Sequence, residues 1–220
     1  MMTGEVRMSV QLFTLPTQKA SLPLRLAHGH FATSHSHINY YLDLAKTKHR
    51  LSEAKEVATE LCSKFKTSKL IDTILCLDGT EVIGTCMAYE LTQSGYANMN
   101  AHRTIYVVTP EHTTGSQLFF RENTAPMIQG KHVLVLAAST VTGFTVHAAV
   151  DAIRYYNGYP EGICSIFTCI DECMGFPITS VYSKKEDLDD YMSCPSTDCP
   201  LCKKGIKLDG LVNSFGISSF

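Results

Sequence analysis

Several features that define major protein classes are missing from this chain of 220 residues. No apolar run reaches the roughly 20 residues of a membrane-spanning helix, so we expect no membrane partner. The first residues, MMTGEVRMSVQLF, lack the apolar core of a signal peptide, which predicts a cytoplasmic protein. No G-x-S-x-G motif occurs, so the sequence does not support a serine hydrolase of that type. Internal repeats and low-complexity tracts are also absent.

An excess of positive charge is missing as well. The chain has 19 Lys and Arg residues against 21 Asp and Glu residues, for a net charge of −2 with His neutral. No basic stripe stands out, which argues against a nucleic-acid partner. The densest basic run, residues 46–50, is interpreted as the solvated start of a helix rather than a binding patch. A hydrophobic share of 45% predicts an ordinary globular core.

What the chain does contain is a regular alternation of apolar patterns. Short apolar runs predict strands at residues 71–77, 104–108, 133–138, 162–168 and 178–182. Apolar residues at helical spacing predict helices at residues 51–66, 82–90 and 145–157. Residues 109–131 read as a long excursion that includes a hairpin. This alternation predicts an α/β fold with a parallel sheet.

The stretch HVLVLAASTVTGFTV, residues 132–146, joins an apolar strand to a helix through a turn rich in hydroxyl groups. Ligands of α/β sheets bind beyond the carboxyl ends of the strands, and N–H groups at a helix start attract anions. Gly143 allows the backbone to fold closely around an anion. The turn lacks the Walker pattern and its lysine. Two interpretations stay open, a phosphate site and an ordinary turn with Thr145 as the N-cap.

The segment LVLAASTVTGFT resembles the phosphoribosyl-diphosphate motif of type I phosphoribosyltransferases. That motif has four apolar residues, two acidic residues, two variable residues, two hydroxyl residues, Gly, any residue and Ser or Thr. Residues 75–84, LCLDGTEVIG, occupy the position of the family's pyrophosphate loop, and residues 109–131 that of its flexible catalytic loop. Residues 37–43, HINYYLD, are similar to a segment of orotate phosphoribosyltransferases. The tail CPLCKKGIKLDGLVNSFG resembles that of a clostridial-type branch.

The resemblance implies a parallel twisted sheet flanked by helices, with a small N-terminal hood and a Cys-rich tail. We divide the chain into a hood at 1–49, a core at 50–183 and a Cys-rich segment at 184–220. The resemblance also implies a homodimer that binds phosphoribosyl diphosphate and a nucleobase, with Mg²⁺ as cofactor.

The resemblance further assigns roles to individual residues. The 5-phosphate site comprises Ser139, Thr140, Val141, Thr142, Gly143, Phe144 and Thr145. Pyrophosphate and Mg²⁺ would lie near Asp78, Gly79 and Thr80. The base would lie under the N-terminal hood, with Tyr40 and Tyr41 as candidate walls of its pocket. The catalytic cation would be Arg121, with Arg103 and Lys131 as weaker candidates.

Ala137 and Ala138 depart from the motif, because they occupy the positions of the two acids that hold the ribose hydroxyls. Losing two charged hydrogen-bond partners, each worth about 1.5–3 kcal/mol, would cost on the order of a hundredfold in binding or rate. Asp171 or Glu172 could replace these acids, although an exposed acidic turn is the favoured interpretation. We therefore expect an orotate-type phosphoribosyltransferase or, alternatively, a non-catalytic regulator that binds a phosphorylated ribose or nucleotide.

The nine cysteines, in a chain without an export signal, indicate reduced thiols or metal ligands rather than disulfides. Cys194, Cys199 and Cys202 form a C-x4-C-x2-C pattern that resembles half of a zinc site. The fourth zinc ligand could be a distant histidine, Asp198, another thiol or a neighbouring subunit, and plain thiols are the favoured interpretation. A zinc-linked interaction protein ranks last among the functions. The segment with His28, His30, His35 and His37 is interpreted as a polar lining or surface rather than a metal site.

Overall fold

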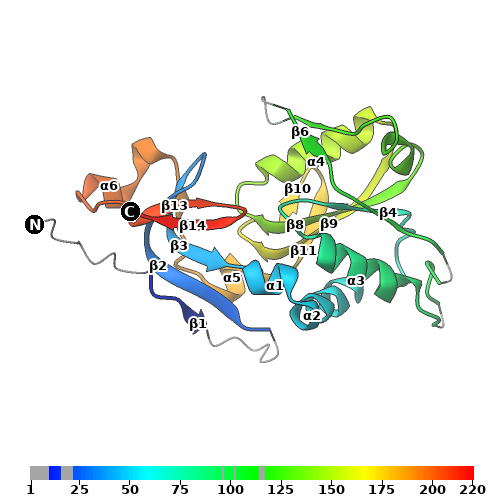
Figure 1. Ribbon diagram of the computed structural model, residues 1–220, viewed down its shortest axis with the longest axis horizontal. Coiled ribbons are helices and arrows are strands. Elements are labelled where there is room, and N and C mark those ends of the chain that lie inside the picture. Colours follow the sequence, from blue (N-terminus) through cyan, green and yellow to red (C-terminus); the bar gives the residue numbers. More distant parts are fainter. Residues whose placement is uncertain (1–9, 16–21, 96, 102, 114–116) are drawn as a thin grey trace, which may run out of the picture. The chain divides into compact units, whose positions relative to one another are not determined.

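The computed structural model describes residues 10–15, 22–95, 97–101, 103–113 and 117–220. The chain forms two compact units (Figure 1). The core unit comprises Lys46–Asp187, and the terminal unit combines the residues up to Ala45 with Leu188–Phe220. The tail therefore belongs to the same unit as the N-terminal segment.

The core unit contains a six-stranded sheet in the order β10-β11-β9-β8-β4-β5, with β10 antiparallel and the other strands parallel. Its strands are β4 (Thr73–Cys76), β5 (Tyr106–Val108), β8 (His132–Thr140), β9 (Tyr159–Thr168), β10 (Glu172–Cys173) and β11 (Phe176–Ser183). The central strand β8 is buried on both faces from Val133 to Ala138, which explains its unbroken apolar run. The predicted parallel α/β sheet is confirmed.

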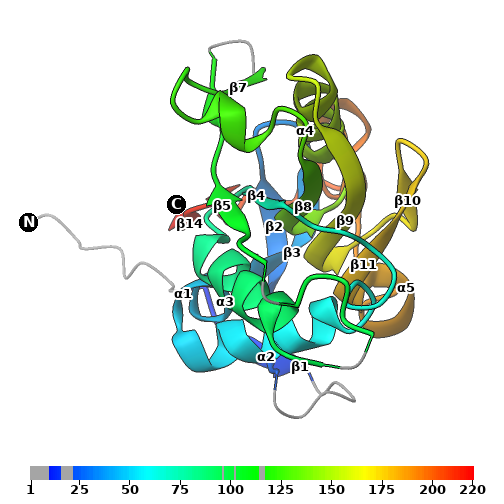
Figure 2. The ribbon, with the colours of Figure 1, turned by 90° about the vertical axis from the view of Figure 1, so that its right-hand side faces the viewer.

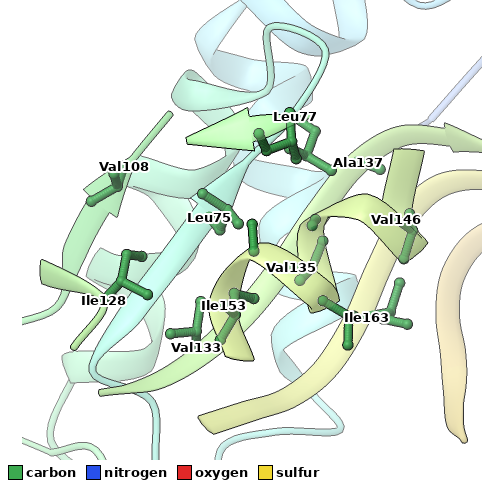
Figure 3. Close-up of a cluster of buried hydrophobic side chains, with 14 of the residues drawn as sticks. Leu75, Leu77, Val108, Ile128, Val133, Val135, Ala137, Val146, Ile153 and Ile163 are labelled. Atoms are coloured by element: carbon green, nitrogen blue, oxygen red, sulfur yellow. The ribbon is translucent and has the colours of Figure 1, made fainter. Parts of the chain in front are cut away.

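Three longer helices cover the two faces of this sheet: α2 (Leu51–Cys62), α3 (Glu81–Thr92) and α4 (Phe144–Tyr155). Figure 2 shows α2 and α3 together on one side and α4 on the other. The apolar stripe of α4, which includes Val146 and Ile153, packs against Val133, Val135 and Ala137 of β8 (Figure 3). Alternate residues of a strand point to opposite faces, so one sheet builds two cores.

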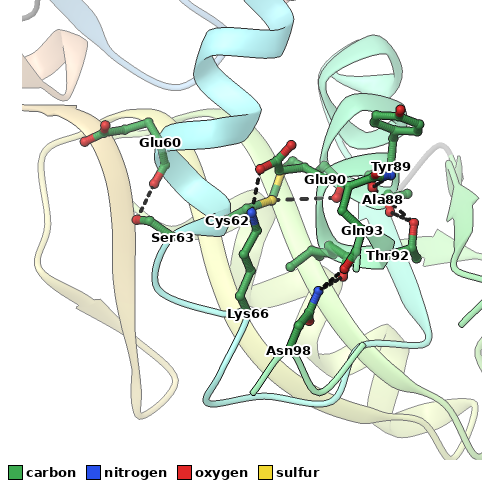
Figure 4. A network of polar contacts seen from close by, with 12 residues as sticks. Glu60, Cys62, Ser63, Lys66, Ala88, Tyr89, Glu90, Thr92, Gln93 and Asn98 are labelled. Carbon is green, nitrogen blue, oxygen red and sulfur yellow. Dashed lines mark hydrogen bonds and ion pairs between the residues drawn. The ribbon is translucent and has the colours of Figure 1, made fainter. Parts of the chain in front are cut away.

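Polar contacts join α2 and α3 at the edge of their shared core (Figure 4). The Cys62 thiol lies 3.6 Å from the Met87 carbonyl, and Lys66 Nζ, just after α2, bonds Glu90 Oε1 of α3. Beyond the end of α3, Asn98 Nδ2 donates to the Gln93 carbonyl at 2.7 Å. The short helices are α1 (Ala45–His49), η1 (Ala125–Met127) and α5 (Lys184–Asp187). None of the helices in the described part of the chain has the length and apolar character needed to cross a bilayer.

The terminal unit contains a second sheet, in which β12-β3-β2-β13-β14 are neighbours in that order and β1 also pairs with β2. Its strands are β1 (Phe13–Leu15), β2 (Leu24–Ala32), β3 (His37–Asp43), β12 (Ser193–Cys194), β13 (Gly210–Asn213) and β14 (Gly216–Ser219). The sequence analysis assigned residues 1–49 to a hood and predicted no strand within it. The structure is more regular because tail strands β12 and β13 pair with β3 and β2.

Candidate functional site

The hydroxyl-rich turn joins β8 to α4 at the carboxyl edge of the core sheet. Gly143 lies immediately before α4 with φ +79°, a left-handed conformation that glycine adopts without strain. The side chains of Ser139 and Thr142 are exposed, whereas Thr140 is only 2% exposed. The predicted strand-to-helix geometry is therefore present, and Thr145 is the second residue of α4 rather than its N-cap.

Hydrogen-bond donors at this turn are open to a ligand. Within the described residues, no protein acceptor takes a hydrogen bond from the backbone N–H groups of Thr142, Gly143 and Thr145. The first backbone bond of α4 runs from His147 N to Gly143 O at 2.8 Å. The buried hydroxyl of Thr140 also has no hydrogen-bond partner. Buried hydroxyl groups are nearly always hydrogen-bonded, so this arrangement suits an anion seated on the turn.

Ala137 and Ala138 lie on opposite faces of β8. Ala137 is fully buried in the apolar core beneath α4 (Figure 3). Ala138 is 6% exposed, and its side chain points to the opposite face of the sheet. An acidic side chain at position 137 would enter this apolar core. The two positions are therefore not equivalent in this chain.

The loop after β4 carries Asp78 and Gly79 with φ values of +56° and +76°. The Asp78 carboxyl lies at the backbone N–H of Ala138. Burial raises the pKa of Asp78, while Lys48, that N–H group and His112 oppose the rise. The Thr80 hydroxyl donates to the carbonyls of Leu77 and Leu136 at 2.8 and 3.2 Å, so it stabilises the loop. Asp78 thus places a carboxyl group beside the ribose positions of the motif.

Lys48 is a functional candidate that the sequence analysis missed. Its side chain is 5% exposed rather than solvated, and its Nζ donates to the Asp78 carbonyl at 2.8 Å. The cation therefore lies beside the predicted pyrophosphate loop. The basic run at 46–50 was the available signal, but the run alone did not identify which of its residues turns inward.

The excursion after β5 contains the predicted hairpin, β6 (Glu111–His112) paired with β7 (Leu118–Phe119). It begins beside the pyrophosphate loop, because Thr109 Oγ1 donates to Glu81 Oε1 at 3.1 Å. Arg121 follows the hairpin, is exposed, and donates two hydrogen bonds of 2.7 Å to Glu111. The guanidinium carbon also lies 5.1 Å from the centre of the Phe119 ring.

The two weaker cation candidates lie at the opposite edge of the sheet. Arg103 bonds Asp72 at 2.7 Å, just before β4, and Lys131 directly precedes β8. Both positions are at amino ends of parallel strands, whereas the hydroxyl-rich turn follows a carboxyl end. Arg103 and Lys131 therefore lie at the opposite end of the strands from the candidate site.

Asp171 and Glu172 follow β9 and are both exposed. Their segment approaches the phosphate turn through neighbouring residues: the Cys173 thiol lies 3.8 Å from the Gly143 carbonyl. Asp78, rather than these two acids, is the carboxyl group at the Ala138 backbone.

The tyrosines proposed as base walls are adjacent on β3, in the terminal unit, so their side chains point to opposite faces of the strand. Tyr40 donates a hydrogen bond of 2.6 Å to Asp190, which together with burial raises its pKa to about 12. Tyr41 is 7% exposed and packs edge-on against Phe31. A base bound on one face of the sheet could therefore contact only one of these two tyrosine rings.

Two of the three tail cysteines lie in a cluster with two histidines, and the third does not. Cys199 and Cys202 come together with His30 and His37, and one potential ligand atom from each lies within 4.8 Å of all the others. Cys194, on β12, is outside this group of four. The sequence did contain both halves of this group, an H-x6-H pair at His30 and His37 and a CxxC pair at Cys199 and Cys202. The sequence analysis considered the two pairs separately.

No family model matches the chain. The chain is 26% identical to the orotate phosphoribosyltransferase of Caldanaerobacter subterraneus subsp. tengcongensis over 82% of the chain and 86% of the relative. A structure of Mycobacterium tuberculosis orotate phosphoribosyltransferase with Fe(III) dicitrate matches with a TM-score of 0.52 and 18% identity, covering 74% of this chain and 91% of that one. The chain has the type I phosphoribosyltransferase fold.

The resemblance stated from the sequence, including its clostridial character, is therefore confirmed. The M. tuberculosis enzyme with 5-phospho-α-D-ribosyl 1-diphosphate also matches, with a TM-score of 0.50 and 17% identity over 67% of this chain and 82% of that one. These proteins are phosphoribosyltransferases, a class of pentosyltransferases. The three segments that resemble family loops, at residues 75–84, 109–131 and 139–145, all fall within the range of the core unit.

Proposed function

We propose that the chain is a phosphoribosyltransferase that transfers ribose 5-phosphate from phosphoribosyl diphosphate to a pyrimidine-type base, with orotate as the first candidate. The observation that carries the proposal is the turn from Ser139 to Thr145, with open amides and the unpartnered Thr140 hydroxyl. A terminal phosphate would accept hydrogen bonds from these groups and lie at the positive end of α4. The orotate phosphoribosyltransferase relative supports the choice of base.

The chemistry requires orientation of the donor more than a nucleophilic side chain. The bond from the anomeric carbon to pyrophosphate breaks, and a bond to the base nitrogen forms through a cation-like sugar. Lys48 would neutralise the departing pyrophosphate beside Asp78 and Gly79, and Arg121 would reach it from the excursion. Asp78 would hold a ribose hydroxyl in place of the acids missing at positions 137 and 138.

Mg²⁺ would arrive with the donor and neutralise its phosphates. Magnesium prefers oxygen ligands and commonly binds through one or two carboxylates together with substrate phosphates. Asp78 is a half-buried carboxylate on the loop that would face the pyrophosphate, so it is the residue that would hold the ion.

The test is pyrophosphate release from phosphoribosyl diphosphate and Mg²⁺ in the presence of orotate, followed by a panel of other bases. We expect release with a pyrimidine-type base and its loss in the Lys48→Ala variant. Release with none of the bases, together with thermal stabilisation by ribose 5-phosphate or a nucleotide, would instead support the regulator. The alanines at positions 137 and 138 are the observation that favours that second function.

A further inference from the structure

The terminal unit contains a cluster of two histidines and two cysteines that have no role in the proposed reaction. His30 lies on β2 and His37 begins β3. Cys199 directly precedes α6 (Pro200–Lys203), which contains Cys202 and follows the short helix η2 (Ser196–Asp198). We propose that His30, His37, Cys199 and Cys202 bind a structural zinc ion.

The distances between the four ligand atoms carry this proposal. His30 Nε2 lies 3.1 Å from His37 Nδ1 and 3.4 Å from Cys199 Sγ. Cys202 Sγ lies 3.7 Å from His30 Nε2 and 3.3 Å from His37 Nδ1. Tetrahedral zinc with bonds of about 2.0–2.1 Å to nitrogen and about 2.3 Å to sulfur separates two nitrogens by about 3.3 Å, and nitrogen from sulfur by about 3.6 Å. These four distances match those of a tetrahedral Cys2His2 site, and all four ligand atoms lie within 4.8 Å of one another.

The surroundings of His30 favour metal binding over a simple polar cluster. Its ring is 1% exposed, and its second nitrogen, Nδ1, lies 2.9 Å from the Ile206 carbonyl. A carbonyl at the second nitrogen fixes the tautomer in which Nε2 is free to coordinate, as is usual for metal-binding histidines. His30 N also bonds Asp209 Oδ2 at 2.8 Å, so the segment after the CxxC pair holds the ligand strand in place.

The CxxC turn has the conformation of a ligand loop. Lys203 N donates to Cys199 O, and Gly205, with φ +71°, donates to Cys202 O. The thiolate is the form that binds metal, and two thiolates with two neutral histidines balance the charge of Zn²⁺.

Zinc would link strands β2 and β3 to the segment around α6. A structural zinc contributes directly to folding, so the metal would hold the tail on the sheet of the terminal unit. Cys194 provides a matched control, because it lies in the same tail and its thiol contacts Cys199 without belonging to the group of four.

The experiment measures zinc by mass spectrometry in the full chain, purified without a metal-affinity tag and reconstituted with Zn²⁺. We expect about one zinc per wild-type or Cys194→Ser chain and at least a tenfold lower content in Cys202→Ser. Wild-type protein reconstituted with Co²⁺ should show the intense visible bands of tetrahedral cobalt and a thiolate charge-transfer band, which tests the site even if Cys202→Ser fails to fold.

Three results would overturn the zinc site: wild-type protein that takes up neither metal, full zinc content in a folded Cys202→Ser variant, or equal loss in Cys194→Ser. Because pyrophosphate release is not a readout here, this proposal and the proposed transferase function can fail separately.

Discussion

The carboxyl group of Asp78, at the end of one core strand, lies at the backbone N–H of Ala138 on the neighbouring strand. Asp78 therefore places one carboxyl group near positions 137 and 138, where the family motif has two acidic residues and this chain has alanines. It also costs stability, because burial raises the pKa of Asp78 and so disfavours its ionised form.

The first prediction concerns Asp78→Asn. A raised carboxyl pKa means that the folded state binds the proton more tightly, so stability falls as pH rises through the folded-state pKa. We expect the variant to be more stable than wild type at neutral pH, and the difference to shrink as pH falls below that value. Asparagine tolerates the positive φ of this position. Activity should fall about tenfold or more.

Urea unfolding at pH 7 and pH 4, with pyrophosphate release as the second measurement, checks this prediction. Lower stability of Asp78→Asn at neutral pH, with unchanged turnover, would show that the carboxylate is structural.

The second prediction concerns Gly143→Ala. A Cβ there would lie 3.0 Å from Ile170 Cδ1 and force an alanine into φ +79°. The backbone strain of about 1–2 kcal/mol would distort the turn and weaken ribose 5-phosphate binding about tenfold. Gly130→Ala is the matched control, since it has φ +67° but no atom within 4 Å of its Cβ. Calorimetric titration should show weaker binding only for the Gly143 variant.

The third prediction concerns restoration of the motif acids. Ala137→Asp would bury a carboxylate against Val135 and Ile163, so we expect a loss of several kcal/mol in the free energy of unfolding and no gain in turnover. Ala138→Asp should be tolerated better, because position 138 is outside that apolar cluster. Thermal unfolding of the two variants checks the order. A stable Ala137→Asp protein with raised activity would contradict it.

The fourth prediction concerns Arg121→Ala. Arg121 and Glu111 are both exposed, so the substitution should leave the thermal midpoint unchanged. If the guanidinium reaches pyrophosphate, kcat should fall on the order of a hundredfold. Glu111→Gln removes the competing carboxylate and should not reduce kcat. Equal turnover of wild type and Arg121→Ala would remove this residue from the mechanism.

The fifth prediction concerns Asp72, which binds Arg103 at 2.7 Å and accepts a hydrogen bond from His132 N at 3.0 Å. Burial opposes ionisation, but these partners lower the pKa of Asp72 overall. A lowered pKa gives stability that is present above the unfolded-state value and lost as pH falls through the folded-state value. Asp72→Asn should therefore be destabilised by about 1–3 kcal/mol at pH 7. In denaturant titrations, the difference from wild type should be smaller at pH 3.

Local patterns predicted the core unit well because its main strands are short, buried apolar runs that can be recognised without knowing which strand pairs with which. The run from Val133 to Leu136 identified β8, and Gly143 identified the turn after it. The terminal unit was not predicted, since β2 pairs with β13 from the far end of the chain. Lys48 and the His30 cluster were missed for the same reason, because pairing across the fold determines their surroundings.

Pairing of β13 with β2 also has a consequence for synthesis on the ribosome. The edge of β2 that receives Gly210 and Leu211 stays without this native neighbour until β13 has been translated, about 180 residues after β2. An unpaired strand edge can recruit strands from other molecules, so nascent or C-terminally clipped chains should be prone to aggregation. Translation of β13 thus covers an edge of β2 that could otherwise pair with strands of other molecules.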